Sequence, residues 1–533
     1  GLMQLVAYGA QDVYLTGNPQ ITFWKVTYRR HTNYAMESIE QTFNGQADFG
    51  RRVVCTISRN GDLAYRTYLQ VTLPEVNQAS HLGGDGSARW LDYIGEQLVN
   101  QVEVEIGGQR IDRHYGDWMH LWNQLTMSSE QEDGYNKMIG HTTQLTYEVR
   151  KNFAGLPQAC SPGTAPVAVC APRSALPETT LYVPLQFWFC QNPGLALPLI
   201  ALQYHEVKIT VDLRTLDECL YACTRGAGAA DTTDLKATDA YRLGVVSASL
   251  YVDYVFLDTD ERRRMAQQPH EYLIEQLQFT GAESVGSSSN KIKLNFNHPC
   301  KELIFTVQKD AHVDYCKMFI KGEGLHHLLG AQPFNYTDAL DALPNSITAF
   351  SGASQADSVI NSGTTAGTNN TQGMFQDPFA DDATGVDTEA TSWDNATVSP
   401  DSGVSDAGAF VLAQTAHKLH CWGENPVVTC KLQLNGQDRF SERLGAYFDV
   451  VQPFQHHSRH PDTGVNVYSF ALRPEEHQPS GTCNMSRIDN SVLQLTLSAA
   501  TVSGTQAAKV RVYAVNYNVL RIMSGMGGLA YSN

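Results

Sequence analysis

Hydrophobic and polar residues alternate along much of the chain, and this alternation predicts short β-strands. The clearest example is residues 101–113 (QVEVEIGGQRIDR), in which two valines and an isoleucine alternate with glutamates. A period of two residues is typical of a strand with one buried face. The Gly107-Gly108 pair that follows can adopt positive φ angles and predicts a tight turn. We therefore expect a β-hairpin here.

A segment of the same design recurs near the other end of the chain. In residues 431–440 (KLQLNGQDRF) two leucines alternate with polar residues, and Asn435-Gly436 is a pair typical of type I′ turns. Gln437 stands where Gln109 stands in the first hairpin, at an offset of 437 − 109 = 328 residues. An offset of this size indicates a duplicated domain rather than a short solenoid repeat.

Three further strand-like segments follow each hairpin in the same order. The corresponding pairs are residues 182–189 and 468–472, 207–211 and 493–497, and 253–257 and 516–520. Each match is short, but the shared order is hard to obtain by chance. Many short strands with Gly, Asn and Pro turns are typical of jelly rolls. We predict an all-β protein of two tandem eight-stranded jelly-roll sandwiches, with short helices and long loop insertions.

Two segments interrupt the strand pattern. Trp118, Leu121, Trp122 and Leu125 recur at the spacing i, i+3, i+4, i+7, which predicts one apolar face of a helix. Residues 258–269 are polar and predict one or two helical turns that connect the two copies. Both helices are expected to be short insertions between strands.

Glycine-containing turns give two further expectations. Asn60-Gly61 separates the strand-like residues 53–58 and 63–73, a pattern that favours a second β-hairpin. Gly525 to Gly528 (GMGG) come too late in the chain to open a helix and are expected to form a flexible tail.

The strand pattern and its interruptions divide the chain into unequal parts. The predicted parts are an N-terminal arm 1–27, a first jelly roll 28–257, a connector 258–270 and a second jelly roll 271–533, which contains a surface insert 322–416 and a C-terminal tail 522–533. The arm is apolar without a sustained period, so it is expected to cover another surface or to fold back on its own domain. The insert is rich in Ala, Ser, Thr, Gly, Asp and Asn, and its apolar islands favour partial order.

Composition narrows the classes of function. Charged residues make up 17% of the 533 residues, against ~25% in an average globular chain. A low charge content indicates surface that is covered in an assembly, or a loop-rich β protein. The net charge of −17 argues against broad nucleic-acid binding, which needs Lys and Arg to neutralise phosphates.

Cysteine usage and hydropathy argue against secretion and membrane insertion. The 11 cysteines are odd in number and form no CxxC pair, so a reducing compartment is expected. No signal peptide is visible, and the longest apolar run, residues 195–202, is far shorter than the ~20 residues of a transmembrane segment.

Candidate catalytic motifs are incomplete. His205-Glu206 and His270-Glu271 start like HExxH, but the position of the second histidine holds an isoleucine in both. Residues 456–460 (HHSRH) form the densest histidine cluster and are expected in a surface loop, with a metal site as the alternative. No nucleophile elbow or phosphate-binding loop occurs, so no enzyme activity, catalytic residue, metal or cofactor is predicted.

Four N-x-[S/T] sequons are candidate glycosylation sites. They are Asn335, Asn369, Asn395 and Asn484, of which the first three lie in the predicted insert. A chain that stays in the cytosol would not meet the secretory glycosylation machinery, and chance occurrence is the competing explanation.

Several long phrases resemble the major capsid proteins of large nucleocytoplasmic DNA viruses, of the algal-virus and giant-virus type. They are residues 4–23 (QLVAYGAQDVYLTGNPQITF), 57–63 (ISRNGDL), 105–112 (EIGGQRID), 192–208 (NPGLALPLIALQYHEVK), 270–281 (HEYLIEQLQFTG), 294–299 (LNFNHP), 432–440 (LQLNGQDRF), 478–490 (QPSGTCNMSRIDN) and 516–531 (NYNVLRIMSGMGGLAY). The phrases span the chain from end to end, and the departures from the family lie in loops.

The resemblance implies a double jelly roll that forms a homotrimer with a pseudo-hexagonal outline. Three chains with two similar domains each would give six lobes that tile an icosahedral shell. It further implies assembly in the host cytoplasm over an internal viral membrane. In that arrangement the arm 1–27 would contact minor capsid proteins and the insert would face outward. Some loops of relatives carry glycans. The partners would be further copies and minor capsid proteins, without direct nucleic-acid contact.

Two other functions stay open at this point. A carbohydrate-binding jelly-roll protein would use the insert or an aromatic loop surface, for example in host attachment. A metal-dependent cupin-like enzyme would use histidines on facing strands.

Overall fold

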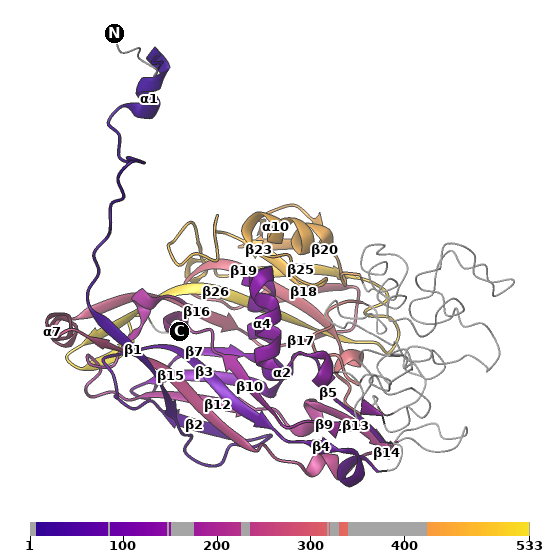
Figure 1. Ribbon diagram of the computed structural model, residues 1–533. Helices are drawn as coiled ribbons and strands as arrows, with labels where there is room; N and C mark the ends of the chain where they lie inside the picture. The colour runs from indigo at the N-terminus through magenta and orange to yellow at the C-terminus, as the bar shows by residue number, and fades with distance from the viewer. Residues whose placement is uncertain are drawn as a thin grey trace.

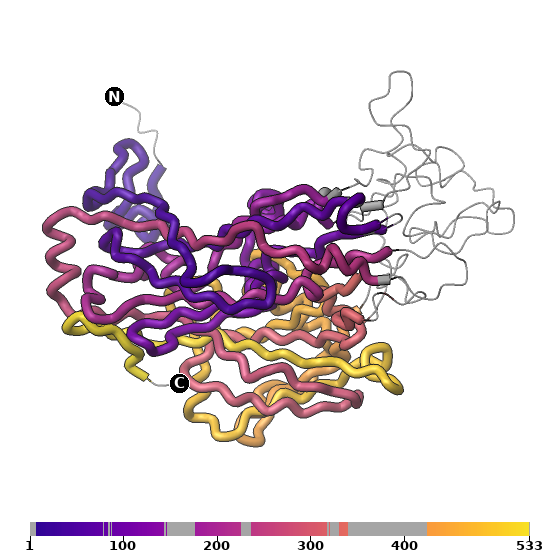
Figure 2. The backbone as a smooth tube through the Cα atoms, turned by 90° about the horizontal axis from the view of Figure 1, so that it is seen from below, coloured from indigo at the N-terminus to yellow at the C-terminus, as the bar shows by residue number. Residues whose placement is uncertain are grey.

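Sixteen strands of the described part of the chain form two jelly rolls that lie side by side in the computed structural model (Figures 1 and 2). The structure describes residues 7–83, 86–146, 149–150, 175–224, 235–316, 319, 330–338 and 424–531. Most of the predicted insert 322–416 therefore lies outside the described residues.

The first jelly roll consists of two antiparallel sheets with four main strands each. One has the order β1 (Tyr34–Gln41), β15 (Ser247–Leu257), β3 (Leu63–Leu73), β10 (Thr179–Pro184). The other has the order β2 (Arg52–Thr56), β12 (Val207–Leu213), β6 (Val99–Ile106), β7 (Gln109–Tyr115). Consecutive strands cross between the sheets or form hairpins, as in a Greek-key jelly roll.

The second jelly roll repeats this topology strand for strand. Its sheets have the orders β16 (His270–Phe279), β26 (Ala508–Met523), β19 (Pro299–Lys309), β23 (Asn466–Ser469), and β18 (Ser289–Leu294), β25 (Ser491–Leu497), β20 (Val427–Leu434), β21 (Gln437–Asp438). The repeated landmarks in the sequence fall on equivalent strands: β6–β7 on β20–β21, β10 on β23, β12 on β25 and β15 on β26. The predicted double jelly roll is confirmed.

Shorter elements decorate the two rolls. The α-helices among the described residues are α1 (Val13–Thr16), α2 (Ile94–Leu98), α3 (Gly116–Thr126), α4 (Ser129–Ile139), α5 (Thr143–Thr146), α6 (Trp188–Gln191), α7 (Thr259–Gln267) and α10 (Gln452–His456), and two π-helices are η2 (Gln78–Leu82) and η10 (Tyr447–Val451). The additional strands are β4 (Val76–Asn77), β5 (Gly86–Trp90), β8 (Val149–Arg150), β9 (Ala175–Leu176), β11 (Leu197–Pro198), β13 (Leu220–Thr224), β14 (Leu235–Lys236), β17 (Glu283–Val285), β22 (Arg443–Leu444), β24 (Cys483–Asn484) and β27 (Met526–Leu529). Both predicted helices form, as α3 and α7. None of the helices in the described part of the chain has the length and apolar character of a membrane span.

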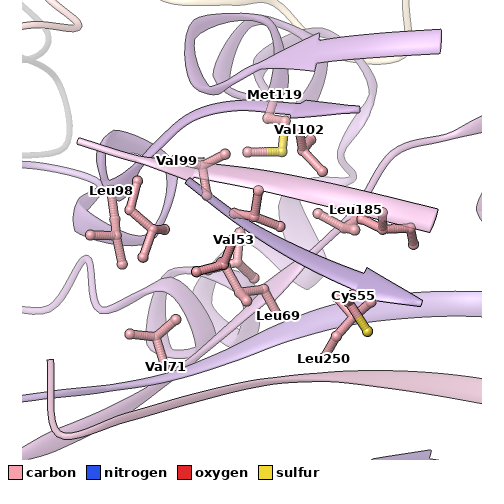
Figure 3. Packing of buried hydrophobic residues seen from close by; sticks show 14 of the residues in the cluster. Val53, Cys55, Leu69, Val71, Leu98, Val99, Val102, Met119, Leu185 and Leu250 are labelled. Carbon is pink, nitrogen blue, oxygen red and sulfur yellow. The ribbon is translucent and has the colours of Figure 1, made fainter. Parts of the chain in front are cut away.

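The core of the first roll lies between its two sheets. Val53 and Cys55 of β2 face Leu69 and Val71 of β3, and all four side chains are buried (Figure 3). Burying one such side chain contributes about 1.5–3 kcal/mol, so the alternating apolar positions supply the main driving force for the sandwich. A separate buried cluster fills the second roll.

The two predicted hairpin turns are confirmed by their backbone angles. Gly107 and Gly108 have φ angles of 58° and 84°, and Asn435 and Gly436 have φ angles of 51° and 79°. Positive φ at both central positions is the geometry of a type I′ turn, which favours Gly and Asn.

The hairpin predicted at Asn60-Gly61 is wrong. Its flanking strands β2 and β3 form, but β2 pairs with β12, whereas β3 pairs with β15 and β10. The two strands lie in opposite sheets and meet through side chains across the core. Alternation shows that each strand has one buried face, but it does not distinguish strands that pair edge to edge from strands that face each other.

The C-terminal residues are also ordered, contrary to the expected flexible tail. β27 pairs with β26, and the Tyr204 amide of the first roll donates to the Gly525 carbonyl at 3.0 Å. The Leu529 amide donates to Gln109 Oε1 at 3.3 Å. A Cβ atom at Gly527 would lie 2.7 Å from Leu202 Cδ2 of the first roll. The glycines thus permit a close contact between the rolls.

We expect Gly116→Ala to destabilise the protein by about 1–3 kcal/mol, because a Cβ atom there would lie 2.2 Å from the Val99 carbonyl oxygen and 2.4 Å from that of Glu96. Gly134→Ala in α4 is the matched control, since no atom lies within 4 Å of its Cβ position. The control should be stabilising by up to ~1 kcal/mol. Thermal unfolding of both variants measures the difference, and equal melting temperatures would contradict the close approach.

Candidate functional site

The junction between the two jelly rolls is a helix packed on the outer face of a sheet. The apolar stripe of α3 contacts the outer face of the sheet β16-β26-β19-β23. From α3 the contacting residues are Trp118, Leu121, Trp122 and Leu125, and from the sheet they include Ile304, Val467, Tyr513 and Val515. All eight are at most 7% exposed. The stripe seen in the sequence is therefore buried against the duplicated domain and not within its own roll.

The opposite side of α3 belongs to the first roll. Met119 is buried in the core of the first roll, whereas the rings of Trp118 and Tyr513 lie 5.6 Å apart across the junction. The helix thus contributes to two hydrophobic clusters at once. Offset aromatic pairs of this kind add about 0.5–1.5 kcal/mol to the burial of their area.

Polar contacts at the margin of the junction fix the orientation of the rolls. Arg511 of β26 lies 3.7 Å from the Asp117 carboxylate at the start of α3. Burial by itself lowers the pKa of the Arg511 guanidinium, but Asp117, Tyr513 and Tyr336 together raise the pKa above its ordinary value. Arg459 pairs with Glu132 of α4 at 2.6 Å. Such charged pairs select one mutual arrangement of the apolar surfaces.

A buried ion cluster holds the C-terminal end of α10. His457 Nε2 lies 2.8 Å from Glu302 Oε2, and its Nδ1 lies 3.0 Å from Glu475 Oε1. Burial by itself lowers the pKa of His457, but the two glutamates together raise the pKa to about 9. The imidazole is therefore a cation at neutral pH, with both N–H groups donating to carboxylates.

The histidine cluster 456–460 is not simply a surface loop, because the side chain of His457 is completely buried. His456 and His460 lie near the main-chain oxygens of Leu472 and Pro461 instead. The part of the chain that the structure describes contains no group of three or more His, Cys, Asp or Glu side chains that could hold a metal ion. The HHSRH sequence gives no sign of Glu302 and Glu475, because both glutamates lie far from it along the chain.

The incomplete HExxH motifs lie at structural contacts. His205 Nδ1 is 3.0 Å from the Gly527 carbonyl oxygen of the C-terminal strand, and His270 Nε2 is 2.7 Å from the Met265 carbonyl oxygen. His205 lies in the loop before β12 and His270 begins β16, so each histidine joins its segment to a neighbouring one.

The candidate glycosylation sites differ in accessibility. Asn335 is 4% exposed, donates through Nδ2 to Gln332 Oε1 at 2.7 Å and accepts from the Thr337 hydroxyl at 2.7 Å. Its amide is therefore inaccessible to a glycosyltransferase in the folded chain. Asn484 is exposed and accepts a hydrogen bond from the Ser486 amide at 3.1 Å. Asn369 and Asn395 lie outside the described residues.

Residues 330–338 of the predicted surface insert are packed into the molecule. Phe334 and Tyr336 are 6% and 2% exposed and belong to the cluster at the junction. Phe334 stacks on His120 of α3 with ring centroids 4.2 Å apart. Residues 330–338 are therefore part of the packed body and do not belong to a surface insert.

The N-terminal arm carries uncovered apolar side chains. It leaves the body next to β1, at the same end as α7 (Figure 1). Tyr14, Phe23 and Trp24 are 91%, 86% and 96% exposed. In the single chain the arm is therefore extended and is not folded back on its own domain.

Two further surfaces with uncovered aromatic side chains were not found from the sequence. One is the outer face of the sheet β1-β15-β3-β10, where Tyr68 stacks on Tyr251 at 5.2 Å and meets Tyr182 at 6.1 Å. The other is the η10–α10 segment, where Phe454 is 82% exposed. The apolar residues within 447–454 (YFDVVQPF) were the available signal for the second surface, but a segment this short did not distinguish a helix from a strand.

Residues 22–258 match the family model "Major capsid protein N-terminus", and residues 261–528 match "Large eukaryotic DNA virus major capsid protein". The chain is 71% identical to the major capsid protein of Phaeocystis pouchetii virus over 100% of this chain and 99% of that protein. It is 63% identical to that of Chrysochromulina ericina virus, over 100% of both.

Solved structures give the same assignment. A quasi-atomic model of the PBCV-1 virus capsid matches with a TM-score of 0.61 and 35% identity, over 96% of this chain and 100% of that chain. The Faustovirus major capsid protein, at 12% identity and a TM-score of 0.61 over 97% of this chain and 94% of that chain, shares the fold.

This chain belongs to the family of large eukaryotic DNA virus major capsid proteins. It is a structural component of the virion that assembles into the capsid with copies of itself, and it is not an enzyme.

We expect the free energy of unfolding to fall as pH rises from 6.5 to above 9. A group whose pKa is higher in the folded than in the unfolded chain stabilises the fold by being protonated. This contribution is fully present below the unfolded pKa and is lost as the pH rises through the folded pKa. For His457, with its pKa of about 9, the loss is on the order of 3 kcal/mol. Thermal unfolding across this pH range measures it.

His457→Gln should remove most of that alkaline pH dependence and destabilise the protein at pH 7, because it leaves two glutamates without their cation. His456→Gln is the control and should keep the wild-type profile. A His457→Gln variant with an unchanged slope above pH 7 would contradict the assignment.

Proposed function

We propose that the chain forms a homotrimer with a pseudo-hexagonal outline, and that these capsomers tile an icosahedral shell. The observation that carries the proposal is the repeated topology: one chain holds two rolls with identical strand order, packed side by side. Three such chains give six comparable lobes and therefore a hexagonal outline. Units with this outline can pack side by side in a shell. Closed cyclic symmetry also lets the two rolls of one chain differ in sequence and loops.

The domain boundaries in this proposal are the arm 1–27, a first roll 28–257, a connector 258–270 and a second roll 271–533. In support, α7 lies between β15 and β16, and Asp258 accepts from the Thr259 amide at its start. The ion pair between Arg262 of α7 and Asp62, at 3.0 Å, ties the connector to the first roll.

We further propose that the arm binds minor capsid proteins beneath the shell, close to an internal viral membrane, and that assembly takes place in the host cytoplasm. The exposed aromatic residues of the arm support a protein partner, because such side chains are enriched at interfaces. Glycosylation at Asn369, Asn395 or Asn484 stays a prediction. Carbohydrate binding stays an alternative role of the insert without support among the described residues.

The purified protein should sediment as a trimer of 58.8 kDa chains. Its melting temperature should rise with protein concentration, because association stabilises the folded chain by mass action. Analytical ultracentrifugation with calorimetry tests both points. A soluble monomer at tens of micromolar protein would contradict the proposed capsomer.

Deleting residues 1–27 should leave the trimer intact and impair formation of closed shells, since the described part of the arm makes few contacts with its own body. Sedimentation separates trimers from shells, and negative-stain electron microscopy shows the particles. A matched variant with Phe23→Ser and Trp24→Ser separates loss of apolar contact from loss of length. An unfolded or monomeric product would show that the arm belongs to the core.

A further inference from the structure

Two cysteines of the second roll lie opposite each other on neighbouring strands. β24 pairs antiparallel with the start of β19, and in this register Cys300 is the direct partner of Cys483. Directly opposed residues of an antiparallel pair point to the same face of the sheet, with Cβ atoms about 4.5–5.5 Å apart. Both side chains accordingly contact the apolar cluster that fills the second roll. Both thiols are free in the structure.

The separation of the two strands suits a disulfide. The Cα atoms of disulfide-bonded cysteines are about 4.4–6.8 Å apart, and those of opposed residues in an antiparallel ladder are about 4.5–5.5 Å apart. The backbone at Cys300 and Cys483 therefore permits a bond between the two sulfur atoms. Among the cysteines that the structure describes, this is the one pair at opposed positions of two strands.

The two thiols differ in their access to solvent. Cys300 is completely buried, and its Sγ lies 3.2 Å from the main-chain oxygen of Glu302. Cys483 is only partly buried. Burial raises the pKa of both thiols, and at Cys483 the charge of Arg439 opposes that rise. A soluble oxidant therefore reaches Cys483 first.

A bond between these thiols would hold a loop that contributes to the buried ion cluster. After β23 the chain runs through the loop 470–482 and returns to β19 at Cys483. This loop carries Glu475, which lies 3.0 Å from His457 Nδ1 just after α10. A link from Cys483 to Cys300 would fix the returning end of the loop on β19.

We propose that Cys300 and Cys483 form a disulfide when the capsid passes from a reducing to an oxidising environment, and that this bond holds the loop 470–482 on β19. Thiols stay reduced in the cytosol, whereas disulfides persist on particles outside the cell. A virion component meets both conditions. The bond forms within one chain, so the inference does not depend on the proposed trimer.

The oxidant is a soluble disulfide such as oxidised glutathione. The Cys483 thiolate attacks one sulfur of this disulfide, which forms a mixed disulfide and releases one glutathione thiolate. The sulfur of Cys300, after losing its proton, attacks Cys483 Sγ and releases the second glutathione thiolate. The two released thiolates take up the two protons that the cysteines lose. The cysteine pair is thus oxidised by two electrons, and oxidised glutathione is reduced to two thiols.

Peptide mapping of the full chain without reductant tests the bond. The chain is incubated with oxidised glutathione, and the remaining free thiols are alkylated before digestion. Mass spectrometry should find one pair of peptides linked through Cys300 and Cys483, which separates after reduction. The oxidised chain should melt on the order of 4 °C above the reduced chain, because the link closes a segment of 483 − 300 = 183 positions.

Three variants separate this pair from the other cysteines. Cys483→Ser should melt like the reduced wild-type chain under both conditions. Cys300→Ala should stop at the mixed disulfide, so Cys483 should carry a glutathione adduct. Cys316→Ser, at an exposed cysteine outside the pair, is the matched control and should keep both the linked peptides and the rise in melting temperature.

Two results would overturn the inference. One is an oxidised wild-type chain in which Cys300 and Cys483 are both alkylated as free thiols. The other is an equal rise in melting temperature in Cys483→Ser, which would assign the effect to other cysteines. Purified particles mapped in the same way should contain the linked peptides, and particles with only free thiols at both positions would contradict oxidation in the virion.

Discussion

The burial of one apolar helix stripe between two copies of the same sandwich is the interaction on which the molecule depends. A jelly roll already has a closed core between its sheets, so its outer sheet faces need no partner to fold. In this chain the outer face of the β16-β26-β19-β23 sheet nevertheless carries an apolar cluster, with Ile304, Tyr513 and Val515 buried under α3. The two rolls are thus one packed unit, and their relative orientation is fixed before any second copy binds.

That arrangement accounts for features that a single soluble domain would not need. The charge content of 17% is low, and exposed apolar side chains lie on the arm, on the α10 segment and on one outer sheet face. These side chains are uncovered in the single chain. A capsid subunit must keep such surfaces for its neighbours, while its net charge of −17 maintains solubility before assembly.

Buried charged side chains fix the relative position of two segments at several places in the structure. Glu96 of α2 accepts from the Tyr135 hydroxyl at 2.6 Å and lies 2.7 Å from His120 of α3, which positions the helix pair at the junction. The His457 cluster does the same for α10. Desolvated pairs of this kind contribute little net stability, but removing one member leaves an unpaired buried charge, so they specify one arrangement strongly.

The sequence by itself determined the strands, the two type I′ turns and the α3 stripe, because each depends on residues within a few positions of one another. It also determined the duplication, because the same local patterns recur in the same order in both halves of the chain. Family membership also followed from it, since long phrases match from end to end. Only the tertiary structure decided that β2 and β3 face each other across the core, that His457 is buried between Glu302 and Glu475, that Asn335 is enclosed and that the C-terminal strand joins the rolls. Alternation along a strand indicates that one face of the strand is buried. Which segment covers that face depends on contacts between residues that lie hundreds of positions apart in the sequence.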